Sequence, residues 1–206
     1  MNQYSTDQEA FWAGKFGREY SERNAGRQRI ESNASMFREI LSHTDNVKSI
    51  IEYGANIGLN LQAIQTLSAD YQLSAVEINE QAYQKLAEIK GVQAYHQSLL
   101  DFRTTQKWDL CFTKGVLIHI NPERLAQAYE LLYSSSNRYI CIAEYYNPEP
   151  VSVSYRGNNE VLFKRDFAGE LMDRFNTLGL VKYGFIYHRD PAFPQDDISW
   201  FLLEKR

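Results

Sequence analysis

Short apolar runs alternate with stretches of helical periodicity along most of the chain. Runs with the length and composition of buried strands occupy Val47–Tyr53, Leu73–Val76, Val92–Tyr95, Asp109–Thr113 and Tyr139–Glu144. Helical stretches lie between them at Leu59–Leu67, Glu80–Ile89 and Glu123–Tyr133. Strands joined by single helices lie parallel, and a parallel sheet is buried on both faces. The pattern therefore predicts an α/β sandwich of three layers around a mostly parallel sheet.

The predicted helix ends carry residues that suit them. Asn79 precedes the second of these helices as an N-cap, and Gly91 follows it as a stop. Asn121 is placed to cap the third helix, with Pro122 at its first position, where a missing N–H does no harm.

The segments outside this alternation also have a pattern. Two helices are predicted first, over Glu9–Asn24 and Gln28–Ser42, and Trp12, Phe16 and Tyr20 share one face of the first because they fall four apart. The C-terminal part reads as a polar, irregular stretch, a helix closed by Gly179, and two β-like runs joined by a turn-rich segment. The polar stretch is Asn147–Lys164 and the helix is Asp166–Leu178. The two β-like runs are Leu180–Tyr187 and Ile198–Glu204, with the turn-rich segment Arg189–Asp197 between them, and we expect the two runs to pair as a hairpin.

Composition narrows the functional classes. The 206 residues suit a single domain, 44% of them are hydrophobic, and the net charge of −4 comes with no Lys/Arg-dense stretch, so we expect no nucleic-acid or membrane partner. No apolar run approaches the roughly 20 residues that span a bilayer, and the polar Met1–Ala10 is no secretory signal. Cys111 and Cys141 lie in strand-like runs as buried thiols, so a cytoplasmic protein is expected. The four histidines lack ligand spacing, and no metal is predicted.

The main candidate for a binding site is the turn after the first strand. Gly54 and Gly58 allow the backbone to turn sharply and to approach a ligand closely. Glu77 ends the next strand, where a carboxylate accepts hydrogen bonds from both ribose hydroxyls of an adenosine ligand. The second and third glycines of the dinucleotide fingerprint are absent, as is the phosphate-binding loop of nucleotide hydrolases. A nucleoside ligand other than NAD or FAD is favoured.

These residues carry a resemblance to a known family. Glu52-x-Gly54-x-Asn56-x-Gly58 resembles motif I of class I S-adenosylmethionine-dependent methyltransferases, with Asn56 at the middle glycine. Glu77 matches their ribose-binding acid, Ser98-Leu99 their adenine-contacting segment, and residues 108–122 their motif IV with the loop beyond. The resemblance covers residues 47–144. It implies S-adenosylmethionine as the cofactor and a Rossmann-like seven-stranded sheet with an antiparallel C-terminal strand.

A narrower resemblance involves segments on both sides of this core. They are similar to the pseudaminic-acid-biosynthesis-associated methylases, which genomic setting links to bacterial surface-sugar biosynthesis. The matching segments are Phe11-Trp12-x-Gly14-x-Phe16-Gly17-x-x-Tyr20-x-x-Arg23-Asn24, Tyr146-Asn-Pro-x-Pro150, Tyr155-Arg156-Gly157 and residues 162–170.

Further residues receive candidate roles. Lys114 contacts the cofactor carboxylate or the acceptor, or is a surface lysine. Tyr20 and Arg23 reach that carboxylate from an N-terminal lid, or belong to a docking face. His119 follows the fourth strand, at the sheet edge where ligands bind in open α/β folds. It acts as a general base for a hydroxyl acceptor, or it orients the cofactor or a neighbouring loop.

The chain divides into four parts within one domain, 1–206. Residues 1–46 form a helical cap, 47–144 the cofactor-binding core, 145–165 the acceptor-site segment and 166–206 the C-terminal helix and hairpin. The third part leaves the fifth strand at the ligand edge, and its polar and ionic groups suit an acceptor that carries an anion. The candidate acceptor residues are Tyr145, Tyr146, Asn147, Tyr155, Arg156, Lys164 and Arg165.

The expected activity is methyl transfer from S-adenosylmethionine to a hydroxyl or amine of a small polar molecule, such as a nucleotide-activated sugar precursor. One alternative keeps the enzyme but takes an amino acid or another small amine as the acceptor. A second is a non-catalytic S-adenosylmethionine-binding module, for which Asn56 in place of glycine is the argument.

Overall fold

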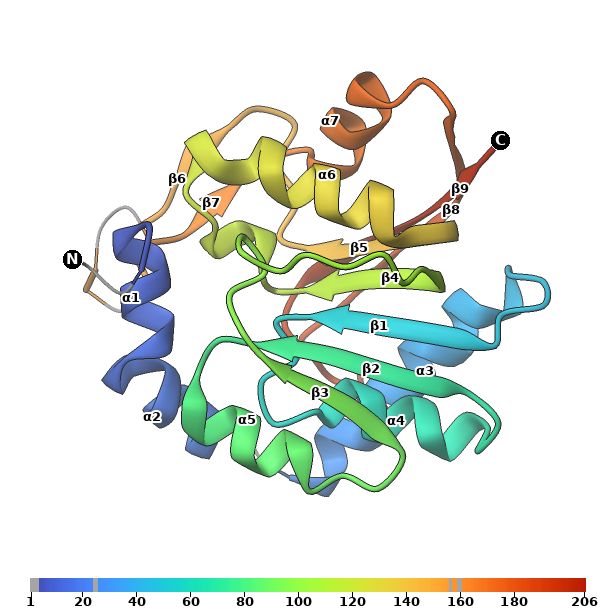
Figure 1. The fold of residues 1–206 in the computed structure, drawn as a ribbon, viewed down its shortest axis with the longest axis horizontal. Coiled ribbons are helices and arrows are strands. Elements are labelled where there is room, and N and C mark those ends of the chain that lie inside the picture. The colour runs from blue at the N-terminus through green and yellow to red at the C-terminus, as the bar shows by residue number, and fades with distance from the viewer. Residues whose placement is uncertain (1–3, 24–25, 156, 159–160) are drawn as a thin grey trace.

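The computed structural model of the chain describes residues 4–23, 26–155, 157–158 and 161–206, and its centre is one twisted seven-stranded sheet (Figure 1). The strand order is β3-β2-β1-β4-β5-β9-β8. The strands are β1 Ser49–Tyr53, β2 Gln72–Glu77, β3 Val92–His96, β4 Trp108–Lys114, β5 Ser136–Glu144, β8 Leu178–Ile186 and β9 Ile198–Lys205. β9 runs antiparallel to both of its neighbours, β5 and β8, while the other pairs are parallel. The predicted fold class is confirmed, including the C-terminal hairpin.

Helices cover both faces of the sheet (Figure 1). They are α1 Asp7–Ala13, α2 Lys15–Arg23, α3 Arg27–Ser42, α4 Leu59–Leu67, α5 Glu80–Ala87, α6 Leu125–Ser135 and α7 Phe167–Arg174, with 3-10 turns η1 Leu117–His119 and η2 Pro122–Arg124. Each strand contributes alternate residues to two cores. Ile51 and Ile140 face α6 and α7, whereas Ile50 and Cys141 face α3 and α4. Because both faces of the central strands are covered, β5 is apolar without interruption from Tyr139 to Ala143, as its sequence pattern indicates.

The N-terminal region differs from its prediction. In place of one helix over Glu9–Asn24, the chain forms α1 and α2, which are separated at Gly14 (φ −88°, ψ −154°). Glycine is a poor helix former, and the carbonyl groups at the end of α1 accept hydrogen bonds from a side chain in place of the backbone N–H groups of a continued helix. The side-chain amide of Asn79 donates to the carbonyl oxygens of Trp12, Ala13 and Gly14 at 3.1–3.2 Å. Asn24 itself lies outside the described residues.

The C-terminal helix is shorter than predicted. α7 ends at Arg174 because Phe175 leaves the helix in an extended conformation and stacks on Tyr133, with ring centroids 4.0 Å apart. Gly179, predicted as the helix stop, lies inside β8. The stretch 147–164, predicted to be irregular, contains two short antiparallel strands, β6 Val151–Ser152 and β7 Phe163–Lys164.

Two predicted caps are present. Asn79 Oδ1 accepts from the backbone N–H of Ala82 at the start of α5. Asn121 Oδ1 accepts from Glu123 N at 3.0 Å, but it caps η2, a 3-10 turn that leads into α6, and not the α-helix itself. Cys111 and Cys141 are buried free thiols, as predicted. Among the described helices, none is both long and apolar enough to cross a membrane.

Candidate ligand-binding site

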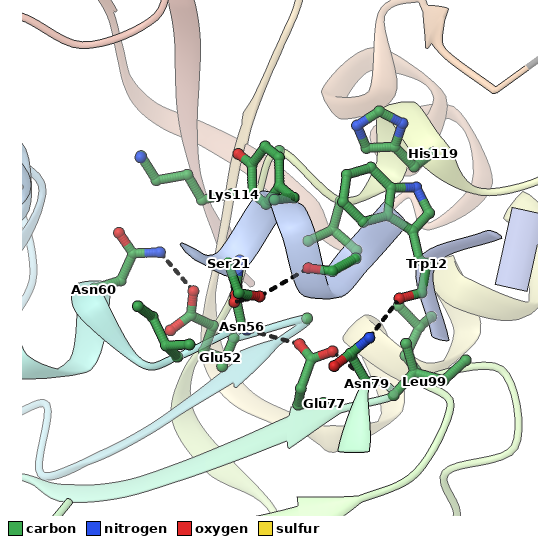
Figure 2. A pocket seen from close by; sticks show the side chains of 18 of the residues that line it. Trp12, Ser21, Glu52, Asn56, Asn60, Glu77, Asn79, Leu99, Lys114 and His119 are labelled. Atoms are coloured by element: carbon green, nitrogen blue, oxygen red, sulfur yellow. Dashed lines mark hydrogen bonds between the residues drawn. The ribbon is translucent and has the colours of Figure 1, made fainter. Parts of the chain in front are cut away.

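A cavity lies at the carboxyl ends of the central strands (Figure 2). The loops that follow β1, β2, β3 and β4 form its floor, and α1 and α2 cover it as an N-terminal cap. Arg29 and Asn33 of α3 and residues 194–196 of the β8–β9 loop complete the wall. This is the edge at which open α/β sheets bind ligands.

Glycine is required at two positions of the turn after β1. Gly54 has φ +78°, and a Cβ there would lie 2.6 Å from a methyl group of Val116. Gly58 has φ +77° and begins α4, and a Cβ there would lie 2.4 Å from Ile89. Gly54 lines the cavity, whereas Gly58 is needed for close packing of α4 against α5.

Asn56 occupies the middle position of the turn with φ +51°, a left-handed conformation that asparagine tolerates better than most residues. Its backbone N–H donates to Glu77 Oε2 at 2.7 Å. Its side-chain Oδ1 accepts from Ser21 Oγ of α2 at 2.6 Å. Asparagine in place of glycine therefore keeps the turn conformation and adds a link to the N-terminal cap.

Glu77 ends β2 with its side chain beside the cavity (Figure 2). Its carboxylate accepts from the backbone N–H groups of Asn56 and Asn79, both at 2.7 Å. Burial raises the pKa of Glu77, and these two hydrogen bonds oppose the increase. The N–H groups hold the carboxylate in one orientation, with lone pairs left for a ligand.

Glu52 is a second buried carboxyl group in the cavity, and the sequence prediction assigned it no role of its own. Asn60 Nδ2 donates to Glu52 Oε1 at 2.5 Å. Glu52 Oε2 and Asn60 Oδ1 are buried and have no hydrogen-bond partner among the residues that the structure describes. Burial raises the pKa of Glu52 to about 8. Two unsatisfied oxygens on linked side chains form a receptor for a group with several N–H donors.

Two cations border the same end of the cavity. Lys114 is the last residue of β4. Burial lowers the pKa of Lys114, and the negative charge of Glu52 opposes this decrease. Arg29 lies close enough to repel Lys114, and neither forms an ion pair within 4.0 Å among the described residues. Arg23 is not part of the wall, because its guanidinium lies 3.8 Å from Glu19 and 5.8 Å from the ring centre of Phe16.

Polar bonds attach the cap to the core on the side of β3. Ser98 Oγ donates to Glu9 of α1, and Leu99 continues the cavity wall. The rings of Trp12 and Tyr20 lie 5.2 Å apart, so these residues meet as predicted although Gly14 divides the helix. The cap thereby covers the cavity above Glu77.

His119 lies in η1 against the cap. Its Nδ1 is 2.6 Å from the carbonyl oxygen of Val161, so Nδ1 carries the proton, and its ring centre is 4.4 Å from that of Trp12. Burial lowers the pKa of His119 to about 4. The imidazole is therefore neutral at physiological pH.

The turn that carries His119 is fixed by Glu144 at the end of β5. Its carboxylate accepts from the backbone N–H groups of Val116 and Leu117 at 3.0–3.1 Å. Burial raises the pKa of Glu144 to about 7, and these hydrogen bonds oppose the increase.

None of the described residues of the predicted acceptor segment (145–155, 157–158 and 161–165) lines the cavity. Lys164 Nζ lies 5.2 Å from the ring centre of Tyr145, Arg165 pairs with Glu170 at 2.6 Å, and Tyr155 lies beside Phe16 and His119. Tyr146 packs against Phe201, and the Asn147 amide bonds to Glu149. Arg156 lies outside the described residues.

The loop between β8 and β9 also borders the cavity. Pro194, Gln195 and Asp196 line the cavity, although the sequence pattern marked this stretch only as a turn. Of the predicted cofactor and catalytic residues, those at the wall are Tyr20, Gly54, Asn56, Glu77, Ser98, Leu99, Lys114 and His119. No group of three or more potential metal ligands occurs in the described ranges.

Comparisons with known proteins place the fold. No protein-family model matches the sequence, and no curated protein matches it significantly. Magnesium protoporphyrin IX methyltransferase from Synechocystis, solved with bound S-adenosylmethionine, is 14% identical with a TM-score of 0.69 and 100% coverage of both chains. The 1,6-didemethyltoxoflavin-N1-methyltransferase from Burkholderia thailandensis, solved with 1,6-didemethyltoxoflavin and S-adenosylhomocysteine, is 14% identical with a TM-score of 0.67, over 92% of this chain and 82% of its own. A plantazolicin methyltransferase with S-adenosylhomocysteine is 12% identical with a TM-score of 0.68, over 97% and 94%. The chain shares their Rossmann-like fold.

Proposed function

We propose that the chain is an S-adenosylmethionine-dependent methyltransferase. The observation that carries this proposal is the covered cavity at the carboxyl ends of β1, β2 and β4, with the fixed carboxylate of Glu77 inside it. Solved methyltransferases with the same fold hold S-adenosylmethionine or S-adenosylhomocysteine. Gly54, Asn56 and Gly58 shape the turn for this ligand.

The residues of the cavity fit both ends of the cofactor. Glu77 accepts from the ribose hydroxyls, and Ser98 and Leu99 border the adenine. At the opposite end, the unsatisfied oxygens of Glu52 and Asn60 accept from the ammonium group. Lys114 and Arg29 then neutralise the carboxylate, which explains why two like charges face one cavity.

The cofactor supplies a methyl group already activated by a sulfonium, so the protein contributes positioning and the exclusion of water. The cap covers the cavity through Glu9, Ser21 and Trp12. His119 contacts Trp12, and a pKa lowered to about 4 makes it a weak base near neutral pH, which fits the positioning role better than that of a base.

The role of Arg29 gives a first prediction. Replacing Arg29 with alanine should weaken S-adenosylhomocysteine binding by about three- to tenfold, because a partly screened charge partner of the ligand carboxylate is lost. Isothermal titration at low and high salt measures the effect, which should shrink as salt rises. Arg23→Ala is the matched control and should bind within about twofold of the wild type. A larger loss in the Arg23 variant would contradict this assignment.

His119 gives a second prediction, measured with any acceptor that supports turnover. His119→Ala should lower kcat by about tenfold and leave its pH profile unchanged, because a histidine with a pKa of about 4 does not titrate near neutrality. His119→Asn retains an N–H for the Val161 carbonyl and should recover part of the rate. An ionisation near pH 6.5 that disappears in His119→Ala would instead identify a general base.

The acceptor is a small polar molecule with a hydroxyl or amine as nucleophile. The segments similar to the pseudaminic-acid-biosynthesis-associated methylases support a nucleotide-activated sugar precursor of a bacterial surface polysaccharide, modified in the cytoplasm. Tyr145, Tyr146, Asn147, Tyr155, Arg156, Lys164 and Arg165 remain the predicted surroundings of this acceptor.

The decisive test is direct binding. Isothermal titration with S-adenosylmethionine and S-adenosylhomocysteine should show one site per chain, and an acceptor screen should release S-adenosylhomocysteine. Failure to bind either ligand would reject the proposed function, and a preference for NAD would redirect it to dehydrogenases.

A further inference from the structure

The cavity continues beyond the residues that fit the cofactor, toward the loop between β8 and β9. Because β9 runs antiparallel to β5, its first residues lie beside the carboxyl end of β5, where Ser199 pairs with Glu144. The preceding loop therefore reaches the same sheet edge as the cofactor turn. Pro194, Gln195 and Asp196 form that part of the wall.

The loop has a fixed conformation. Gln195 Nε2 donates to the carbonyl oxygen of Ser32 in α3 at 2.9 Å. Asp190 Oδ1 accepts from the backbone N–H groups of Ala192 and Phe193, both at 2.8 Å. These bonds hold the wall residue Gln195 and the part of the loop that precedes the wall.

Gln195 presents an unsatisfied acceptor. Its Oε1 is buried and meets no donor anywhere in the described parts of the chain. The amide cannot be reversed without loss of the bond from Nε2 to Ser32, so the oxygen is the atom left without a partner. A buried oxygen in this state indicates a missing N–H or O–H donor.

Asp196 places a carboxylate next to this oxygen in the chain. The Tyr145 hydroxyl lies near this carboxylate: burial, and after it the negative charge of Asp196, raises the pKa of Tyr145. Tyr20 of the cap lies near Tyr145 and also lines the cavity. This end of the cavity therefore combines an anion, an amide oxygen and aromatic rings.

The two candidate nucleophiles, a hydroxyl group and an amine, differ in the number of hydrogen-bond donors that they offer. A hydroxyl group has one proton and can satisfy one of these two acceptors, whereas an amine has at least two N–H donors and is positively charged when protonated. Aromatic rings and a carboxylate together are also the usual surroundings of a bound cationic amine. We propose that the methyl acceptor is a small primary amine held by Asp196 and Gln195 Oε1. This inference rests on the proposed methyltransferase function.

The reaction then proceeds in balanced steps. The bound ammonium releases one proton to water through solvent-exposed Asp196, and the nearby charge of Lys114 favours the neutral amine. The nitrogen lone pair forms a bond to the methyl carbon of S-adenosylmethionine as the carbon–sulfur bond breaks. The electron pair of that bond stays on sulfur, giving S-adenosylhomocysteine and a methylammonium product.

The test compares amines with alcohols of the same skeleton in the full-length protein. The pairs are glucosamine and glucose, phenethylamine and phenylethanol, and ethanolamine and ethylene glycol. Release of S-adenosylhomocysteine and mass spectrometry of the product should show methyl on nitrogen for at least one amine and no transfer to its alcohol partner.

Variants locate the effect. Asp196→Asn should raise KM for the amine by about ten- to a hundredfold, since a charge-assisted hydrogen bond is lost, with a smaller change in kcat. The KM of Asp196→Glu should fall between the KM of the wild type and that of Asp196→Asn. Asp173→Asn, an exposed aspartate of α7, is the matched control and should behave as wild type.

Three results would overturn the inference: transfer to alcohols alone, no transfer within any pair, or an unchanged KM in Asp196→Asn. Titration of each variant with S-adenosylhomocysteine separates these results from failure of the proposed function. If S-adenosylhomocysteine still binds while any of these three results is found, the amine acceptor is rejected and the proposed methyltransferase function is not.

Discussion

Replacing Glu77 with alanine should weaken S-adenosylhomocysteine binding on the order of 10²- to 10³-fold. The carboxylate has two functions, because it accepts from the backbone of Asn56 and Asn79 and is placed to accept from the ribose hydroxyls. Its removal leaves buried N–H groups without partners and also lets the cofactor turn relax. Each ribose hydroxyl left without a partner in the complex costs about 1–3 kcal/mol, and the loss of both partners gives an effect of this size.

Isothermal titration measures this loss, and circular dichroism shows whether the variant remains folded. Glu80→Ala, at an exposed position in the first turn of α5, is the matched control and should bind normally. If Glu77→Ala stays folded and binds within threefold of the wild type, Glu77 does not hold the ribose.

The affinity for S-adenosylhomocysteine should rise by about 30- to 100-fold between pH 6 and pH 8. With its pKa at about 8, Glu52 is protonated in the free protein below that pH. The ligand ammonium favours the carboxylate form, so binding releases a proton and gains about tenfold per pH unit below the pKa. Above pH 8 the ligand amine loses its own proton, since α-amino groups titrate near 7.7–8.0, and the affinity should fall again.

Titrations across this range, in buffers of different ionisation enthalpy, report the affinity and the number of protons released. Burial raises the pKa of Glu77 as well, so a variant must identify the group responsible. Glu52→Gln retains the shape and an acceptor oxygen but cannot ionise, and it should bind weakly with most of the pH dependence gone. A flat wild-type profile, or an unchanged slope in Glu52→Gln, would contradict the assignment of the ammonium to Glu52.

The sheet could be read from the sequence because its signals are local and agree with one another. A strand buried on both faces needs an uninterrupted apolar run, as in Ile140 to Ala143, and Asn79 caps α5 through its own backbone neighbours. The ends of helices that depend on distant partners were predicted less well. The break at Gly14 is stabilised by the amide of Asn79, 65 residues away in sequence, and α7 stops because Phe175 packs on Tyr133.

The same distinction applies to the site. Gly54 and Glu77 were predicted because a turn after a strand and an acid after the next strand have a recognisable spacing, and Asn56 through the resemblance to motif I. The pairing of Glu52 with Asn60 depends on the geometry of β1 against α4, and the approach of Gln195 depends on the antiparallel course of β9. Their sequence signals were a carboxyl group inside an apolar strand and a polar turn before the last strand.

The attachment of the cap has a consequence for the order in which the chain folds and opens. Its polar bonds join residues far apart in sequence, by 89 positions for Glu9 and Ser98 and 35 for Ser21 and Asn56. Such contacts form only after the sheet has assembled, because loop closure opposes them until their partners are in place. We therefore expect the cap to be a late-docking, separately opening unit whose backbone amides exchange with solvent long before those of β1 and β4. Ligand that binds beneath it should slow this exchange, so the local opening of two short helices would govern how quickly product leaves.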